Sequence, residues 1–170
     1  MNISKFTQKS IQAVNDLEKL AYEYGNQEIE QEHLLMSLLR QEDSLILKLV
    51  AKMGIDQNLF LNGVEQTLNK RVKVSGGQPY IGQYLNKVLV QAEDEAKAMG
   101  DEYVSVEHLF LSMIIGNLLT LIDCLDGLLC KFVDVHTLSS FTNGYLSILR
   151  YPFIFCSIRN ITLIISTVKW

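Results

Sequence analysis

Apolar residues recur every three or four positions along much of residues 1–114, which is the spacing of one buried face of an α-helix. Two long stripes of this kind consist of Ile11, Val14, Leu17, Ala21 and Tyr24, and of Ile81, Leu85, Val88, Leu89, Ala92, Ala96 and Met99. Gly25 and Gly100 each follow the last residue of a stripe, where a left-handed residue commonly ends a helix. We therefore predict an amphipathic helix before each of these glycines.

Two shorter stripes lie between them, formed by Leu45, Leu49, Val50 and Met53 and by Phe60, Val64 and Leu68. Gly54 ends the first, and Asp56 is placed to cap the N-terminus of the second. The segment 71–79 contains Gly76, Gly77 and Pro79, a composition typical of a loop. The sequence thus predicts a helical unit over residues 1–70, followed by a linker over 71–79.

An internal repeat appears when the sequence is shifted by 75 positions. The identical pairs are Gln8 with Gln83, Glu18 with Glu93, Ala21 with Ala96, Gly25 with Gly100, Glu32 with Glu107, His33 with His108, Leu34 with Leu109 and Ser37 with Ser112. Each copy has a helix, a glycine, a short link and then Glu-His-Leu at the start of another helix, which Ser105 can cap in the second copy. We assign repeat one to residues 1–70 and a partial repeat two to residues 80–114.

Composition changes sharply near Ile114. Every Glu, Ala, Gln and Met of the chain lies in residues 1–114, together with 27 of the 34 charged residues. Because these are strong helix formers that helical domains use throughout, their loss indicates that residues 115–170 do not continue the repeat. This apolar segment is interpreted as a genuine tail, an unusual fusion, a frameshifted product or a wrongly assigned gene end.

Charge and cysteine content exclude several classes of protein. With 15 basic against 19 acidic residues, the chain lacks the basic stripe that nucleic acid requires. Residues 1–9 are polar and resemble neither a secretory signal nor a transit peptide, so we expect a cytoplasmic protein. Cys124, Cys130 and Cys156 form no Cys-x-x-Cys pair and are expected to be free thiols.

The apolar segment also raises the question of a membrane. Arg159 interrupts the apolar residues 151–168, and the longest uncharged stretch, 135–149, has 15 residues, several of them polar. A membrane-spanning helix needs about 20 predominantly apolar residues. Membrane insertion is therefore not favoured, although weak membrane association through this segment stays open as an alternative.

Four segments in order carry a resemblance to a known family: Lys5-Phe6-Thr7, Gly25-Asn26-Gln27-Glu28-Ile29, Glu32-His33-Leu34-Leu35 and Ser105-Val106-Glu107-His108-Leu109-Phe110. At this spacing, residues 1–114 resemble the Clp N-terminal repeat domain of ClpB-type ATP-dependent disaggregases. The resemblance implies an all-α fold, a pseudo-twofold repeat of four-helix units whose second repeat is incomplete here. It also implies a module that binds unfolded or aggregated polypeptides, or adaptor proteins. Residues 115–170 do not match.

Catalytic motifs are absent from the sequence. It contains no Gly-x-x-x-x-Gly-Lys-Ser/Thr loop for ATP, and Gly76-Gly77 is followed by Gln78 and Pro79 rather than by lysine. His33 and His108 have no second His or Cys at the third or fourth following position, so we expect structural roles and no metal site. Cys124 and His136 are not expected to form a nucleophilic pair. We predict a chain that is not an enzyme and takes no cofactor.

The resemblance also assigns substrate-binding positions, which fall on Thr7, Asp101 and Glu107. Each has a structural alternative: Thr7 can cap the first helix, Asp101 can belong to the turn after Gly100, and Glu107 can interact with a helix N-terminus. Two other interpretations of the whole chain stay open. One is a free-standing adaptor or decoy, and the other is a truncated or frameshifted product.

Overall fold

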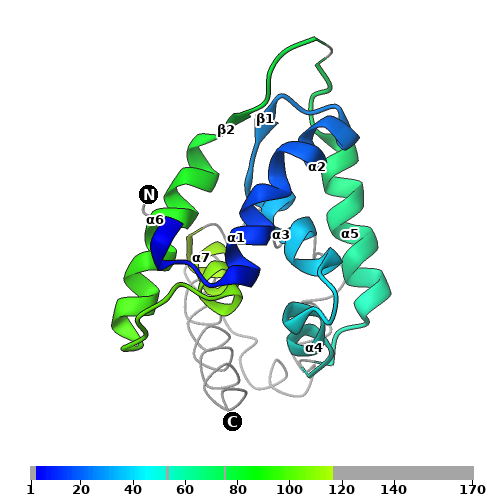
Figure 1. Cartoon of the computed structure of the whole chain (residues 1–170). Coiled ribbons are helices and arrows are strands. Elements are labelled where there is room, and N and C mark those ends of the chain that lie inside the picture. The colour runs from blue at the N-terminus through cyan, green and yellow to red at the C-terminus, as the bar shows by residue number, and fades with distance from the viewer. Residues whose placement is uncertain (1–2, 53, 75, 117–170) are drawn as a thin grey trace, which may run out of the picture.

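The computed structural model describes residues 3–52, 54–74 and 76–116 (Figure 1). These residues are mostly helical, so the predicted all-α class is confirmed. In chain order the elements are η1 (Ile3–Lys5), α1 (Gln8–Asn15), α2 (Leu17–Tyr24), β1 (Glu28–Ile29), α3 (Gln31–Arg40), α4 (Leu45–Lys52), α5 (Gln57–Lys70), β2 (Tyr80–Ile81), α6 (Gln83–Ala98) and α7 (Val106–Gly116).

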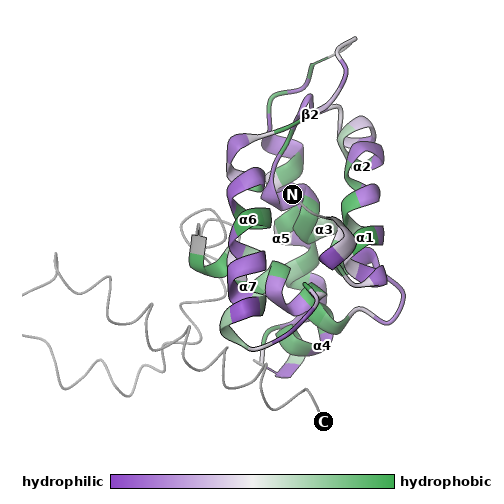
Figure 2. Cartoon of the chain, turned by 60° about the vertical axis from the view of Figure 1, so that its left-hand side comes forward, coloured by the Kyte–Doolittle hydropathy of each residue, from purple (hydrophilic) through white to green (hydrophobic). Residues whose placement is uncertain are grey.

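Helix α3 lies at the centre and is surrounded by α1, α2, α4, α5, α6 and α7. Every residue from Gln31 to Leu39 is buried, including the polar ones. Apart from α7, which is buried along most of its length, the surrounding helices are amphipathic, with hydrophilic and hydrophobic stretches alternating along them (Figure 2). Because α3 is covered on all sides, it is the scaffold against which the other helices are positioned.

The predicted helix ends are confirmed in both repeats. Gly25 and Gly100 have left-handed backbones, with φ of 70° and 74°. After each glycine the next N–H donates to a carbonyl five residues earlier, from Asn26 to Ala21 at 2.8 Å and from Asp101 to Ala96 at 2.9 Å. This is the closing hydrogen bond of a glycine-terminated helix.

Two very short parallel strand pairs cross between the repeats. β1 pairs with β2, and Gly82 N–H donates to Ile29 O at 2.8 Å. In the same way Phe6 forms a parallel bridge with Val104, and Thr7 N–H donates to Val104 O at 2.9 Å. Each pair joins the start of one repeat to the link of the other, and the corresponding positions differ by 75. The two repeats are therefore related by an approximate twofold axis.

The first predicted helix is not continuous. It is divided at Asp16 into α1 and α2, whereas its counterpart α6 runs unbroken through 16 residues. Ser37 Oγ of α3 donates to the Ala13 carbonyl at 2.9 Å, and a side chain inserted into the helical ladder bends a helix. The equivalent Ser112 donates instead to Leu109 O of its own helix. One uninterrupted helix before Gly25 was therefore a wrong prediction.

The other predicted helix ends and the buried stripe of α5 in repeat one are confirmed, whereas Met53, the last residue of the stripe before Gly54, lies outside the described residues. Asp56 Oδ1 accepts the Leu59 N–H at 2.8 Å and caps α5, whose apolar stripe Phe60, Val64 and Leu68 is buried. Gly54 follows α4 with φ of 76°. No helix among the described residues combines the length and the apolar character needed to cross a bilayer.

Candidate functional site

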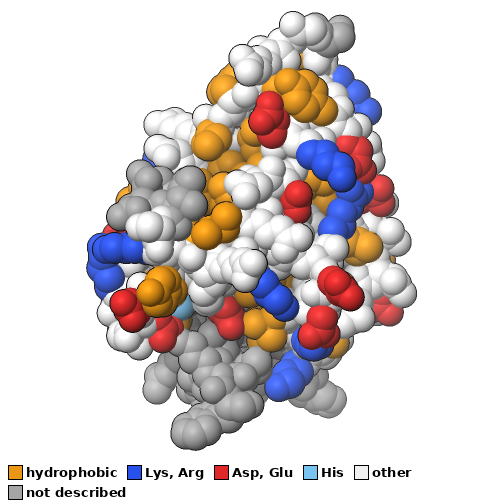
Figure 3. Space-filling model, in the orientation of Figure 1, with side chains coloured by type: hydrophobic (Ala, Val, Ile, Leu, Met, Phe, Trp, Pro, Cys, Tyr) orange, Lys and Arg blue, Asp and Glu red, His pale blue; other side chains and the backbone are white. Residues whose placement is uncertain are grey.

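A surface depression lies where the N-terminal ends of α1, α4 and α7 meet. It has a volume of about 250 Å³, and the described residues that line it are Thr7, Lys9, Asp43, Leu45, Lys48, Ser105, Val106 and Glu107. On the face shown in Figure 3, basic and acidic side chains surround a small hydrophobic area below α1. Two of the three predicted binding residues, Thr7 and Glu107, thus lie close together in the fold although they are far apart in the sequence.

Thr7 is the N-cap of α1. Its Oγ1 accepts the Ser10 N–H at 3.4 Å and lies 2.9 Å from Ser10 Oγ. Its backbone N–H is held by Val104 O, which belongs to the link before α7. The predicted capping role of Thr7 is therefore confirmed, and the same residue forms part of the wall of the depression.

The floor of the depression is apolar and its rim is charged. Val106 is buried and Leu45 is half-buried against the core. On the rim Lys48 forms an ion pair with Asp43, and its ammonium group lowers the pKa of the Asp43 carboxyl. Glu107 stands in the first turn of α7, where a negative charge suits the helix dipole. The depression can therefore hold an apolar group while offering charges of both signs around it.

Asp101, the third predicted residue, does not line the depression with Thr7 and Glu107. It follows Gly100, as the turn alternative predicts, and its Oδ2 lies 3.0 Å from Nε2 of His108. The carboxylate oxygen lies within hydrogen-bond distance of the ring nitrogen, although the N–H is not ideally aligned with it. The side chain of His108 is 1% exposed and that of Asp101 is 32% exposed.

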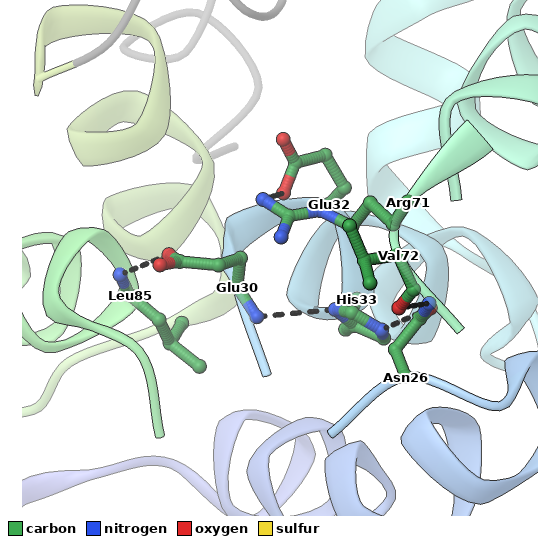
Figure 4. Close-up of polar contacts among 7 residues, drawn as sticks. All are labelled: Asn26, Glu30, Glu32, His33, Arg71, Val72 and Leu85. Carbon is green, nitrogen blue, oxygen red and sulfur yellow. Dashed lines mark hydrogen bonds and ion pairs between the residues drawn. The ribbon is translucent and has the colours of Figure 1, made fainter. Parts of the chain in front are cut away.

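His33, the counterpart of His108, is the centre of a buried polar network (Figure 4). Its Nδ1 accepts the Glu30 N–H at 3.1 Å, and its Nε2 lies 3.1 Å from Asn26 Oδ1. The Asn26 amide in turn donates to Val72 O at 3.2 Å. Burial, together with the positive charge of Arg71, lowers the pKa of His33 to about 4. The imidazole is therefore neutral, and both of its nitrogens are engaged within the fold.

Glu30 joins the two repeats through its side chain (Figure 4). Its Oε2 accepts the Leu85 N–H at 3.0 Å, in the first turn of α6, although the residue is only 2% exposed. The carboxylate occupies the space that a Cβ on Gly82, the N-cap of α6, would need. Burial raises the pKa of Glu30. Helix α6 is thus capped by a carboxylate from the opposite repeat rather than by its own N-cap side chain.

Comparison with models of known protein families shows to which family this chain belongs. The model of the Clp repeat (R) N-terminal domain matches residues 5–123. The chain belongs to the Clp repeat N-terminal domain family. The resemblance inferred from the sequence motifs is confirmed, and the match extends past residue 114 into the segment where composition changes.

Curated relatives of this Clp repeat domain include ClpB chaperones. The ClpB of Nitratidesulfovibrio vulgaris is 43% identical over 119 residues, which are 67% of this chain and 14% of that protein. The ClpB of Porphyromonas gingivalis is 40% identical over 114 residues, 67% of this chain and 13% of that protein. The chain therefore spans about one seventh of the length of these relatives.

Solved structures share the fold of the Clp repeat domain. The N-terminal domain of ClpV1 from E. coli superposes with a TM-score of 0.65 at 23% identity, over 75% of this chain and 78% of that one. The Hsp104 N-terminal domain of Candida albicans gives a TM-score of 0.61 at 21% identity, over 72% of this chain and 81% of that one. The expected Clp N-domain architecture is confirmed.

Several contributors to this Clp repeat site escaped the sequence reasoning. Lys9, Asp43 and Lys48 reach the depression only through tertiary packing, and no local motif marks them. Asn26 could have been found from the repeat, because the 75-residue shift pairs it with Asp101, and each of the two follows one of the equivalent glycines. Glu32 and Arg71, which form an ion pair at 3.1 Å, join segments 39 positions apart. Cys124 and His136 lie outside the described residues.

Proposed function

We propose that this Clp repeat domain binds unfolded or aggregated polypeptides, or an adaptor protein that presents them, at the depression between α1, α4 and α7. The observation that carries the proposal is the meeting of Thr7 and Glu107 around one depression, although 100 positions separate them in the chain. We assign Thr7 and Glu107 to direct contact with the bound polypeptide.

The chemistry of the depression suits a partner of variable sequence. Leu45 and Val106 offer apolar contact, which is not directional and depends on buried area rather than on sequence. The Thr7 hydroxyl and the charged rim can hydrogen-bond backbone amides and polar side chains at the edge. A shallow site of this kind supports weak, reversible capture, which a module that hands its client onward requires.

The comparisons support the same function. The curated relatives are ClpB chaperones. A further solved structure of this fold, with a TM-score of 0.64 at 22% identity, is described as "Peptide from EAEC T6SS Sci1 SciI protein", so a peptide accompanies a domain of this shape there. The 170 residues contain no phosphate-binding Gly-x-x-x-x-Gly-Lys-Ser/Thr loop, and we assign no catalytic step to them.

Binding of a labelled, permanently unfolded model protein to the full chain tests the proposal. We expect Glu107→Gln to raise the Kd roughly fivefold, the effect of losing about 1 kcal/mol of contact free energy. Thr7→Ala should also weaken binding, and a thermal melt separates this effect from the loss of the cap. Fluorescence anisotropy at low and high salt measures the Kd of both variants.

Glu93→Gln is the matched control. Glu93 is a half-buried residue of α6 that does not line the depression, and its substitution makes the same change of charge. The Kd of this variant should equal that of the unaltered chain. Equal Kd values for the Glu93 and Glu107 variants would refute the assignment of the site.

A further inference from the structure

The contact between Asp101 and His108 continues to the wall of the depression. Nδ1 of His108 accepts the Ser105 N–H at 3.0 Å and lies 2.9 Å from Ser105 Oγ. Ser105 is the first of three consecutive residues, with Val106 and Glu107, that line the depression. Asp101 is therefore connected to the site through one buried imidazole, without lining the site itself.

The protonation of His108 follows from these contacts. A ring nitrogen that accepts an N–H carries no proton of its own, so the proton of the neutral imidazole is on Nε2. Nε2 is the nitrogen that faces the Asp101 carboxylate at 3.0 Å. An acceptor oxygen facing Nε2 favours the tautomer in which Nδ1 carries no proton and accepts the Ser105 N–H.

Repeat one contains the same arrangement with a neutral residue. Asn26, His33 and the Glu30 N–H occupy the positions 75 residues before Asp101, His108 and the Ser105 N–H. The distances agree closely, at 3.1 Å for both contacts of His33 against 3.0 Å for the corresponding two contacts of His108. In repeat one an amide oxygen therefore supports the ring, so a neutral acceptor is sufficient at this position there.

We propose that Asp101 is a positioning residue, which acts through His108 to fix the wall formed by residues 105–107, and does not bind the client itself. The inference rests on the proposed function of the depression. It reassigns one of the three residues for which the sequence indicates direct contact. It also gives His108 a role in binding although its side chain is 1% exposed.

Two substitutions of Asp101 separate positioning from direct contact. Asp101→Asn reproduces the repeat-one arrangement and removes the charge, so its Kd for the unfolded model protein should stay within about twofold of the unaltered chain. Asp101→Ala removes the acceptor and should raise the Kd roughly fivefold, as Glu107→Gln does. Glu102→Gln, an exposed neighbour in the same turn, is the control for loss of charge alone.

Nitrogen-detected NMR of the imidazole rings gives a second readout that does not depend on binding. In Asp101→Asn, His108 should keep the shifts of a ring protonated at Nε2, and the amides of residues 105–107 should stay in place. In Asp101→Ala both sets of signals should move. Retention of both in Asp101→Ala would overturn the proposal, whatever the binding result.

The binding results distinguish the two proposals. If Asp101→Asn weakens binding as strongly as Glu107→Gln while the His108 signals stay unchanged, Asp101 contacts the client directly and the positioning role is wrong. If Glu107→Gln has no effect but the NMR signals respond to Asp101→Ala as expected, positioning stands and the proposed binding site fails.

Discussion

The two repeats use one framework for different purposes. In both, a glycine ends a helix, an Asn or Asp follows it, and a histidine seven positions later bonds a backbone N–H three residues before itself. In repeat one this network continues through the bond from Asn26 to Val72 O and through the bond from the Leu85 N–H to Glu30, which joins the two repeats. In repeat two it leads to the depression. Shared hydrogen bonds therefore maintain the fold, whereas the residues that differ decide whether the network leads to the junction between the repeats or to the depression between α1, α4 and α7.

The helix starts illustrate this difference. Thr7 and Gly82 are equivalent N-caps, of α1 and α6. Thr7 caps its own helix with a hydroxyl, while Gly82 leaves space for the Glu30 carboxylate from the other repeat. A side chain is therefore tolerated at one start and excluded at the other.

The largest expected effect comes from Gly82→Ala. The new Cβ would collide with the buried Glu30 carboxylate, which would lose its bond to the Leu85 N–H without reaching water. Displacing a buried charged group of this kind costs about 2–4 kcal/mol, whereas Thr7→Ala removes only a cap worth about 1 kcal/mol. Urea unfolding of both variants measures the contrast.

A double variant tests the stated cause of the Gly82 effect. Because Glu30→Ala removes the carboxylate that the added methyl group would meet, combining it with Gly82→Ala should destabilise the protein by clearly less than the sum of the two single changes. Additive free energies of unfolding would show that the collision with Glu30 is not the reason.

The second effect is a pH dependence that repeat one owes to His33. Its pKa is about 4 in the folded chain against 6.5 as the ordinary value, so the folded state holds the neutral ring. Above pH 6.5 neither state binds the proton, and between 6.5 and 4 only the unfolded state does. Stability is therefore lost as pH falls through this window, by about 2 kcal/mol at about pH 5.

His33→Gln isolates this contribution. Glu30, whose pKa is raised, acts in the opposite direction over part of the same range, so the unaltered chain alone mixes the two groups. The difference in unfolding free energy between the unaltered chain and His33→Gln should shrink by about 2 kcal/mol from about pH 7.5 to about pH 5. A difference that is constant with pH would contradict a neutral buried His33.

The smallest expected effect concerns the two equivalent serines. Ser37→Ala leaves the Ala13 carbonyl at the bend without its side-chain donor and should cost about 1 kcal/mol. Ser112→Ala removes only a bond within its own helix and should cost less. Amide hydrogen exchange should become faster around Asp16 in the first variant and stay unchanged in α6 in the second. Faster exchange in α6 for either serine would argue against the assigned cause of the bend.

Sequence periodicity was sufficient for the helices but not for their junctions. The glycine ends, the Asp56 cap and the buried stripe of α5 follow from local rules, and the structure confirms them. The bend at Asp16 depends on Ser37, and the α6 cap depends on Glu30, both from distant segments. The two-residue strands are too short to show an alternating pattern.

The candidate site was only partly predictable for the same reason. Family resemblance indicated Thr7, Asp101 and Glu107, and the turn and cap roles of the first two followed from neighbouring residues. That Thr7 and Glu107 line one depression while Asp101 lies behind it depends on how α7 meets α1, which no local pattern records.

The crossed strand pairs have a consequence for how such a domain arises. Phe6 pairs with Val104, and Ile81 pairs with Ile29, so each repeat supplies backbone hydrogen-bond partners to the other. A single copy would leave these backbone groups without partners. Two identical copies on separate chains could satisfy each other in the same way, as a symmetric dimer with exchanged segments. In this chain the linker of residues 71–79 joins the two halves, so both sets of pairing partners are present within one molecule.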